Sequence, residues 1–199
     1  MAQSEFDLAA LISSRICHDL ISPIGAINNG LELLGMSGQS LNGPELSLIH
    51  ESVQNASARL RFFRIAYGAA SDQEVGRAEV ISILNDMMSG GRLSVEWGPL
   101  EGQPRDVVRL ALLAIQCLET AMPYGGRIEV SSSRKQWKIH GKSEKFNQID
   151  DLWTAVTATQ IIPEISSAQV QFALLPAAAK EQNRDLRVTR TATDITIQF

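Results

Sequence analysis

The sequence predicts an α+β protein: an N-terminal helical hairpin that pairs with a second copy into a dimeric four-helix bundle, followed by an α/β sandwich. Three observations support this prediction. Apolar residues recur at alternating steps of three and four along the first third of the chain, which is typical of bundled helices. Beyond residue 74, helical and alternating strand patterns follow one another. Hydrophobic residues make up 44% of the 199 residues, which is enough to bury a core.

Two apolar series predict the arms of the hairpin. The first series has the a/d spacing of a packed helix: Leu20, Ile24, Ile27, Leu31 and Leu34. Gly35, Gly38 and the turn Asn42-Gly43-Pro44 then end this helix. The second series has the same spacing: Leu46, Ile49, Val53, Ala56, Leu60, Phe63 and Tyr67. A hairpin cannot bury both of its seams alone, so we expect a homodimer. The alternative is that the seams pack against the C-terminal half of the same chain.

The segment Ser71-Asp72-Gln73 is the expected boundary between a hairpin domain, residues 1–73, and a second domain, residues 74–199. The pattern after this boundary predicts helices at 79–88, 106–122 and about 165–180. It predicts strands at 92–97, 127–133, 136–140, 186–190 and 195–199. Such a mixture favours one mixed sheet with helices on one face.

Charge and cysteine content exclude several classes of partner. The formal net charge is -4 with both signs interspersed, which argues against binding of nucleic acid or an anionic membrane. Cys17 and Cys117 lie in apolar helical patterns far apart, as expected for reduced thiols of a cytoplasmic protein. The chain shows no bilayer-spanning run and no secretion signal.

His50 and His140 lack metal-ligand spacing, so we interpret both as structural and expect no metal site.

His18 is the candidate nucleophile of the first helix. Small or polar groups, together with one arginine, surround it on one helical face: Ser14, Arg15, Ser22 and Gly25. Another protein can therefore approach His18 closely. A neutral imidazole attacks through one ring nitrogen, while a carboxylate such as that of Asp19 can accept a hydrogen bond from the other. Neighbours in a helix point about 100° apart, so this contact requires both side chains to lean together.

Pro23 interrupts the pattern of this helix. A proline removes one helical hydrogen bond and costs about 3 kcal/mol inside a helix, so we expect a bend just below His18. One interpretation is a structural kink without chemistry.

On the second arm, Arg59, Arg61 and Arg64 form either a solvated face or a group that neutralises a phosphoryl group or meets an acidic partner.

The run His18-Asp19-Leu20-x-Ser22-Pro23-Ile24 resembles the phosphoacceptor motif of sensor histidine kinases. The resemblance implies that His18 is the phosphoacceptor and Asp19 the assisting acid, the two catalytic residues. It also implies a dimeric bundle whose lower half docks receiver domains. We expect Arg15, Ser22, Pro23 and Gly25 to support that docking.

The second domain resembles the ATP-binding domain of these kinases, but in degenerate form. Thr120 stands where the kinases have their metal-holding asparagine. The aspartate-x-glycine-x-glycine loop and the glycine-rich lid are absent between Ser131 and Phe199. Transfer from ATP depends on a metal ligand and a phosphate cradle. The resemblance therefore implies a histidine-kinase ATPase-like sandwich without a nucleotide site or bound cofactor, with Mg²⁺ supplied by a partner receiver domain.

The whole chain resembles the ChpT-type histidine phosphotransferases of alphaproteobacteria. The resemblance rests on the motif Arg15-x-Cys17-His18-Asp19-Leu20-x-Ser22-Pro23-x-Gly25-Ala26-x-x-Asn29-Gly30. It implies a cell-cycle phosphorelay that carries phosphoryl groups from the receiver domain of a hybrid histidine kinase to downstream response regulators. Two alternatives remain open: a non-catalytic dimeric adaptor that binds response regulators, and a soluble self-phosphorylating histidine kinase.

Overall fold

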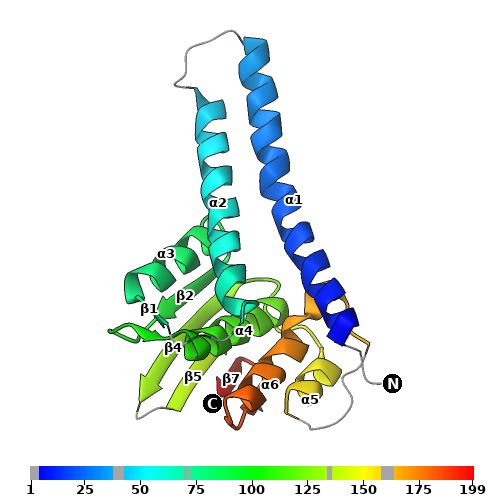
Figure 1. The fold of residues 1–199 in the computed structure, drawn as a ribbon, viewed down its shortest axis with the longest axis vertical. Coiled ribbons are helices and arrows are strands. Elements are labelled where there is room, and N and C mark those ends of the chain that lie inside the picture. Colours follow the sequence, from blue (N-terminus) through cyan, green and yellow to red (C-terminus); the bar gives the residue numbers. More distant parts are fainter. Residues whose placement is uncertain (1–4, 38–42, 70, 72, 134–135, 158–163) are drawn as a thin grey trace.

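The computed structural model describes residues 5–37, 43–69, 71, 73–133, 136–157 and 164–199. Two long helices, α1 (Glu5–Ser37) and α2 (Pro44–Ala66), form the predicted hairpin. Figure 1 shows both arms projecting from a part in which helices cover a sheet. Pro44 begins α2 directly after the extended Gly43, where its missing N–H costs no helical hydrogen bond.

The helix α1 begins well before the predicted apolar series and continues through the buried Pro23 without a break. Figure 1 shows it curving gently along its length. The arms approach each other closely at Gly30, where an added Cβ would lie 2.6 Å from Cγ1 of Ile49. Glycine at this position therefore allows the contact between the arms.

The structure divides the apolar series of the hairpin into two sets, each with members seven residues apart on its helix. The inner seam is buried or half-buried: Leu20, Ile27, Leu34, Ile49, Ala56 and Phe63. The outer seam is exposed: Ile24, Leu31, Leu46, Val53 and Leu60. On both helices the outer residues are rotated away from the inner residues in the same direction around the helix axis. Because the two arms run antiparallel, this rotation places the outer residues of both arms on the same side of the hairpin. The alternative of packing against the C-terminal half therefore holds for Leu20, Phe63 and Tyr67, which contact the core, but not for the exposed outer seam.

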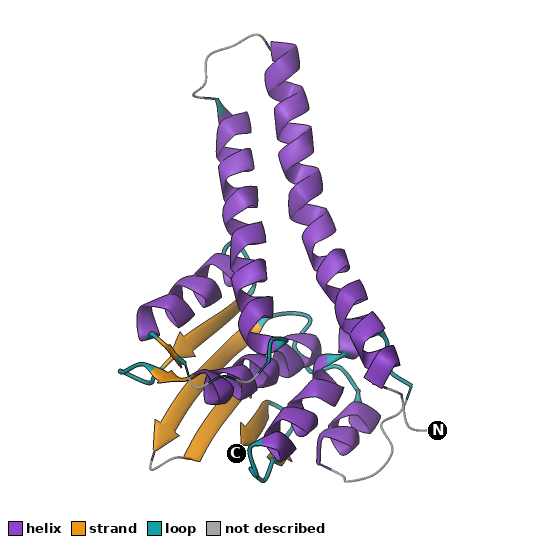
Figure 2. Ribbon diagram, in the orientation of Figure 1, coloured by secondary structure: helices purple, strands orange, loops and turns teal. Residues whose placement is uncertain are grey.

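The rest of the chain forms a mixed sheet covered by helices on one face, as Figure 2 shows. The strands are β2 (Leu93–Trp97), β4 (Gly126–Ser133), β5 (Gln136–Lys142), β6 (Arg187–Arg190) and β7 (Asp194–Gln198). Their order is β2-β4-β5-β7-β6, and of the paired neighbours only β2 and β4 run parallel. The covering helices are α3 (Arg77–Met88), α4 (Arg105–Ala121) and α6 (Gln171–Glu181). These elements confirm the predicted layout within a few residues.

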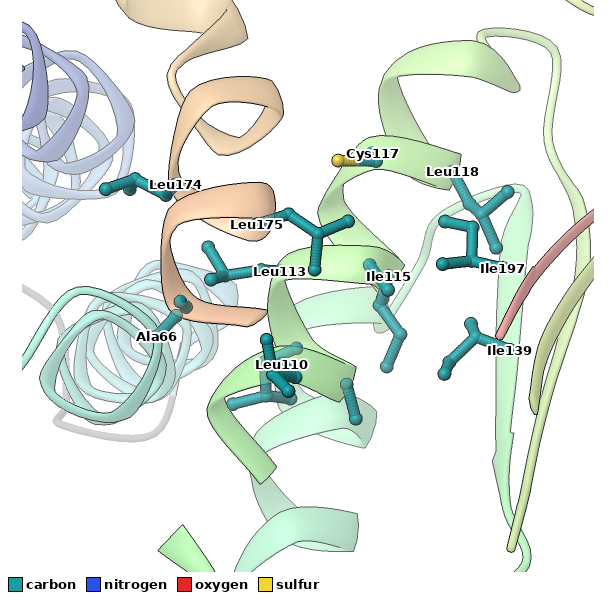
Figure 3. Packing of buried hydrophobic residues seen from close by; sticks show 14 of the residues in the cluster. Ala66, Leu110, Leu113, Ile115, Cys117, Leu118, Ile139, Leu174, Leu175 and Ile197 are labelled. Atoms are coloured by element: carbon teal, nitrogen blue, oxygen red, sulfur yellow. The ribbon is translucent and has the colours of Figure 1, made fainter. Parts of the chain in front are cut away.

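The core of the protein is built around α4. Figure 3 shows Leu113 of α4 near Leu175 of α6, and Leu118 beside Ile139 and Ile197 of the sheet. The same core includes Ala66 at the end of α2, so it crosses the predicted boundary after residue 73. The division into two domains stays a prediction. The core nevertheless joins the hairpin firmly to the sheet layer.

Three features differ from the prediction. Helix α5 (Asp150–Thr157) was not predicted, because eight residues are too few to show a helical period. A small antiparallel pair, β1 (Glu74–Val75) with β3 (Gln103–Pro104), was also missed. The single helix predicted at about 165–180 is a 3₁₀ turn, η1 (Ser167–Gln169), followed by α6. Ser166 is extended and forms a capping box with Gln169, so it begins a new helical turn there.

Candidate functional site

His18 lies on an open face of α1, with 81% of its side chain exposed. Ser14, Cys17 and Ser22 on neighbouring turns are also exposed. A Cβ added at Gly25 would meet nothing within 4 Å. The structure therefore places the candidate nucleophile where another protein can reach it.

Asp19 lies beside His18 but points inward, with only 9% of its side chain exposed. Its Oδ1 is 3.1 Å from Nδ1 of His18, so the two neighbours lean together as the proposed contact requires. This distance suits an Nδ1–H that donates to the carboxylate. Nε2 then carries the lone pair on the exposed ring.

Arg15 holds the other oxygen of the same carboxylate. Its Nε donates to Oδ2 of Asp19 at 2.7 Å, one helical turn away. Its Nη1 donates to the carbonyl oxygen of Ala168 in η1 at 2.9 Å. Both oxygens of Asp19 therefore have a partner, one from the ring and one from the guanidinium group.

The arginines of α2 have separate roles in the structure. Arg59 is the one near the site, with Nη1 3.6 Å from Oδ2 of Asp19 and Nε donating to Oδ1 of Asn55 at 2.9 Å. Arg61 pairs instead with Asp86 at 2.8 Å, and Arg64 pairs with Glu79 at 3.3 Å. Of the basic run, Arg59 is the residue that joins the site.

Helix α4 contributes residues that the sequence analysis missed. Burial raises the pKa of Glu119, while the nearby charges of Arg15 and Arg59 act to lower it. Burial also raises the pKa of Tyr67 to about 12, and its hydroxyl donates to Oε1 of Gln116 at 3.1 Å. No local pattern identifies Glu119 or Gln116, because both lie in a long apolar helix about 100 residues from His18.

A pocket of about 320 Å³ lies between α1, α2 and α3, one turn along from His18. Ser22 and Pro23 line it, together with Asn55, Arg59 and Asp86. Of the four residues expected to support docking, two line this pocket and Gly25 borders the open face. Arg15 is instead engaged within the chain.

Thr120, for which the resemblance to kinases implies the place of the metal-holding asparagine, makes contacts within the chain. Its Oγ1 accepts a hydrogen bond from Nε2 of the buried Gln171 at 2.8 Å. Its carbonyl oxygen accepts another from Nδ2 of Asn147 at 3.0 Å.

Among the described residues, no group of three or more histidine, cysteine or acidic side chains is arranged to hold a metal ion. The described helices also include none with the length and hydrophobicity to cross a membrane.

Comparisons with known proteins identify the family. Residues 77–194 match the family described as the histidine phosphotransferase C-terminal domain. The chain is 34% identical over 202 residues to the protein phosphotransferase ChpT of Brucella abortus (strain 2308), a match covering 96% of this chain and 94% of that protein. The chain belongs to the histidine phosphotransferase family. A solved bacterial phosphotransferase structure, 30% identical, superposes with a TM-score of 0.78 over 100% of this chain and 98% of its own. This histidine phosphotransferase is therefore an enzyme of phosphoryl transfer.

Proposed function

We propose that this phosphotransferase takes a phosphoryl group onto Nε2 of His18 from the receiver domain of a hybrid histidine kinase and passes it to downstream response regulators. The observation that carries the proposal is the exposed imidazole whose Nδ1 lies 3.1 Å from the inward-pointing carboxylate of Asp19. The open face of α1 and the adjoining pocket serve as the docking surface. Ser22, Pro23 and Gly25 belong to this surface.

The chemistry of the relay follows from this arrangement. The Nε2 lone pair attacks the phosphorus of the donor's aspartyl phosphate. A bond forms between Nε2 and phosphorus while the bond from phosphorus to the aspartate oxygen breaks, and the donor aspartate leaves as a carboxylate. Nδ1 keeps its proton, so the ring becomes positively charged and the Asp19 carboxylate stabilises it. In the second step the acceptor's aspartate carboxylate attacks phosphorus, and Nε2 leaves with its electron pair.

We also propose that the Mg²⁺ of the reaction belongs to the receiver domain. Phosphoryl transfer is promoted by a cation that neutralises the oxygens of the transferred group. The acidic site of a receiver domain supplies carboxylate oxygens, the ligands that Mg²⁺ prefers. The residues of the histidine phosphotransferase then have only to present a neutral imidazole and a positioned carboxylate.

A transfer experiment tests the role of His18. A receiver domain labelled with radioactive acetyl phosphate is mixed with the wild type, His18→Ala or His50→Ala, the last being a matched exposed histidine of the hairpin. We expect acid-labile label on the wild type and on His50→Ala, and none on His18→Ala. Asp19→Ala should slow transfer by about 10²-fold, as for loss of a positioned acid or base. Undiminished transfer to His18→Ala would refute the proposal, and an adaptor would bind the receiver without accepting label.

We propose that the C-terminal part does not supply phosphoryl groups from ATP. The position of the kinase asparagine is taken by Thr120, which bonds to Gln171 and Asn147 of the same chain. Calorimetric titration with ATP and Mg²⁺ should therefore give no binding heat. Micromolar binding, with label appearing on His18 from ATP, would favour the kinase alternative instead.

We propose that two copies pair through the outer seam into a four-helix bundle. The support is an exposed apolar stripe on both arms, with Leu31 and Leu60 each 54% exposed in the single chain. Such a stripe is unfavourable in water unless a partner covers it. Leu31→Glu combined with Leu60→Glu should give monomers in sedimentation equilibrium. Leu100→Glu, at a leucine outside the hairpin that is 80% exposed, should stay dimeric. A monomeric wild type at micromolar concentration would rule out the bundle.

A further inference from the structure

We propose that Arg15 is a positioning residue for phosphoryl transfer: anchored on the carbonyl oxygen of Ala168, it holds the Asp19 carboxylate so that His18 keeps its proton on Nδ1 and presents Nε2. This inference rests on the proposed function of His18. It gives the C-terminal part of the chain a role in the chemistry at the hairpin.

The contacts of Arg15 place it behind the reacting group and not on the docking face. Only 14% of its side chain is exposed, against 81% for His18. Nε and Nη1 of one planar guanidinium group make its two hydrogen bonds, to Asp19 and to Ala168. A lysine has one compact ammonium group, so it cannot reproduce this two-directional contact.

The anchor of Arg15 is itself fixed from inside the C-terminal part. The carbonyl oxygen of Ala168 also accepts a hydrogen bond from Nε2 of Gln171 at 3.0 Å. Gln171 is fully buried and donates at 2.8 Å to Oγ1 of Thr120 as well. A chain of polar contacts therefore runs from Thr120 through Gln171, Ala168 and Arg15 to Asp19. Thr120 of α4 therefore supports, through this chain of contacts, the acid beside His18.

Without Arg15, the carboxylate of Asp19 would keep only a longer contact to a cation, the 3.6 Å approach of Arg59. The carboxylate would then be free to turn toward Arg59 and away from Nδ1 of His18. The ring would lose the partner that favours a proton on Nδ1, and part of its population would carry the proton on Nε2, the attacking atom. Protonated Nε2 has no lone pair for attack on phosphorus.

The experiment measures both the tautomer and the rate. Nitrogen-15 chemical shifts of the His18 ring report which nitrogen carries the proton, and rapid-quench assays follow label leaving a phosphorylated receiver domain. Arg15→Gln and Arg15→Lys should both raise the Nε2–H population and slow transfer by about 10-fold, a part of the full effect of an acid or base. Arg77→Gln is the matched control, since Arg77 also donates to a carbonyl oxygen, that of Pro99 at 3.0 Å. It should change neither readout.

A double-mutant cycle separates positioning from a general loss of stability. If Arg15 acts through Asp19, Arg15→Gln made in the Asp19→Asn background should slow transfer by no more than about twofold. Equal slowing in both backgrounds would overturn the inference. An unchanged tautomer together with a wild-type rate in Arg15→Gln would also overturn it, while the loss of transfer in His18→Ala would leave the proposed function intact.

Discussion

The hairpin and helix α4 are both rich in apolar residues, but they bury them to different extents. In α4, 13 of 17 residues are buried, because helices and the sheet surround it. In the hairpin, the inner seam and the lower ends of both arms are covered, and the outer seam is exposed. One chain therefore completes the core around α4 but only half of the hairpin core. His18 lies on the hairpin, the region whose apolar residues one chain leaves partly exposed.

The two cysteines provide the largest expected contrast between these regions. Cys17 is exposed on α1, whereas Cys117 is buried in α4, where burial raises the pKa of its thiol. Only the thiolate reacts with a disulfide reagent, and a buried thiol reacts only when the structure opens. At neutral pH we expect the thiol of Cys17 to react at least about 10³-fold faster than the thiol of Cys117.

Stopped-flow absorbance with an aromatic disulfide reagent measures these two rates. Cys17→Ser should remove the fast phase, and both thiols should react quickly in denaturant. A fast phase that survives in Cys17→Ser would show that the core around α4 opens readily. This result would contradict the expected difference in reaction rate between the two thiols.

Truncation of leucine in each region is the next contrast. Leu113 of α4 is fully buried, so Leu113→Ala should lower the free energy of unfolding by about 2–5 kcal/mol. Leu31→Ala in the outer seam should cost less than about 1 kcal/mol at concentrations where the chain is monomeric. Urea unfolding followed by circular dichroism measures both values. A large loss for Leu31→Ala that grows with protein concentration would instead sharpen the proposal that a second copy covers this seam.

Tyr67, where the two regions meet, provides the smallest effect. Burial raises its pKa from 10.0 to about 12 in the folded state. The folded protein therefore binds this proton more tightly than the unfolded chain does. The stabilisation is complete below about pH 10 and is lost as the pH rises toward about 12.

Ultraviolet titration of a Tyr124→Phe variant, which leaves Tyr67 as the one tyrosine of the chain, follows this ionisation. Tyr67→Phe should flatten the decline in stability over the same pH range. Ionisation of Tyr67 near pH 10 would show that the junction between α2 and α4 is open to water.

The order of the elements was largely predictable because it depends on local periodicity. Steps of three and four between Leu20 and Tyr67 predict helices whatever surrounds them, and alternation predicts β4, β5 and β7. The motif around His18 was visible for the same reason, since its residues are consecutive. Helix α5 was missed because eight residues carry too little of this information.

The sequence by itself therefore determined a helical hairpin, a following α/β part, and His18 beside Asp19 as the candidate reacting pair. Only the tertiary structure decided which apolar residues form the inner seam, because burial depends on which face meets the other arm. It alone brought Ala168 to Arg15 across 153 residues and Glu119 close to both Arg15 and Arg59. These contacts join side chains and a carbonyl group from distant segments, and no local spacing encodes the packing that brings such segments together.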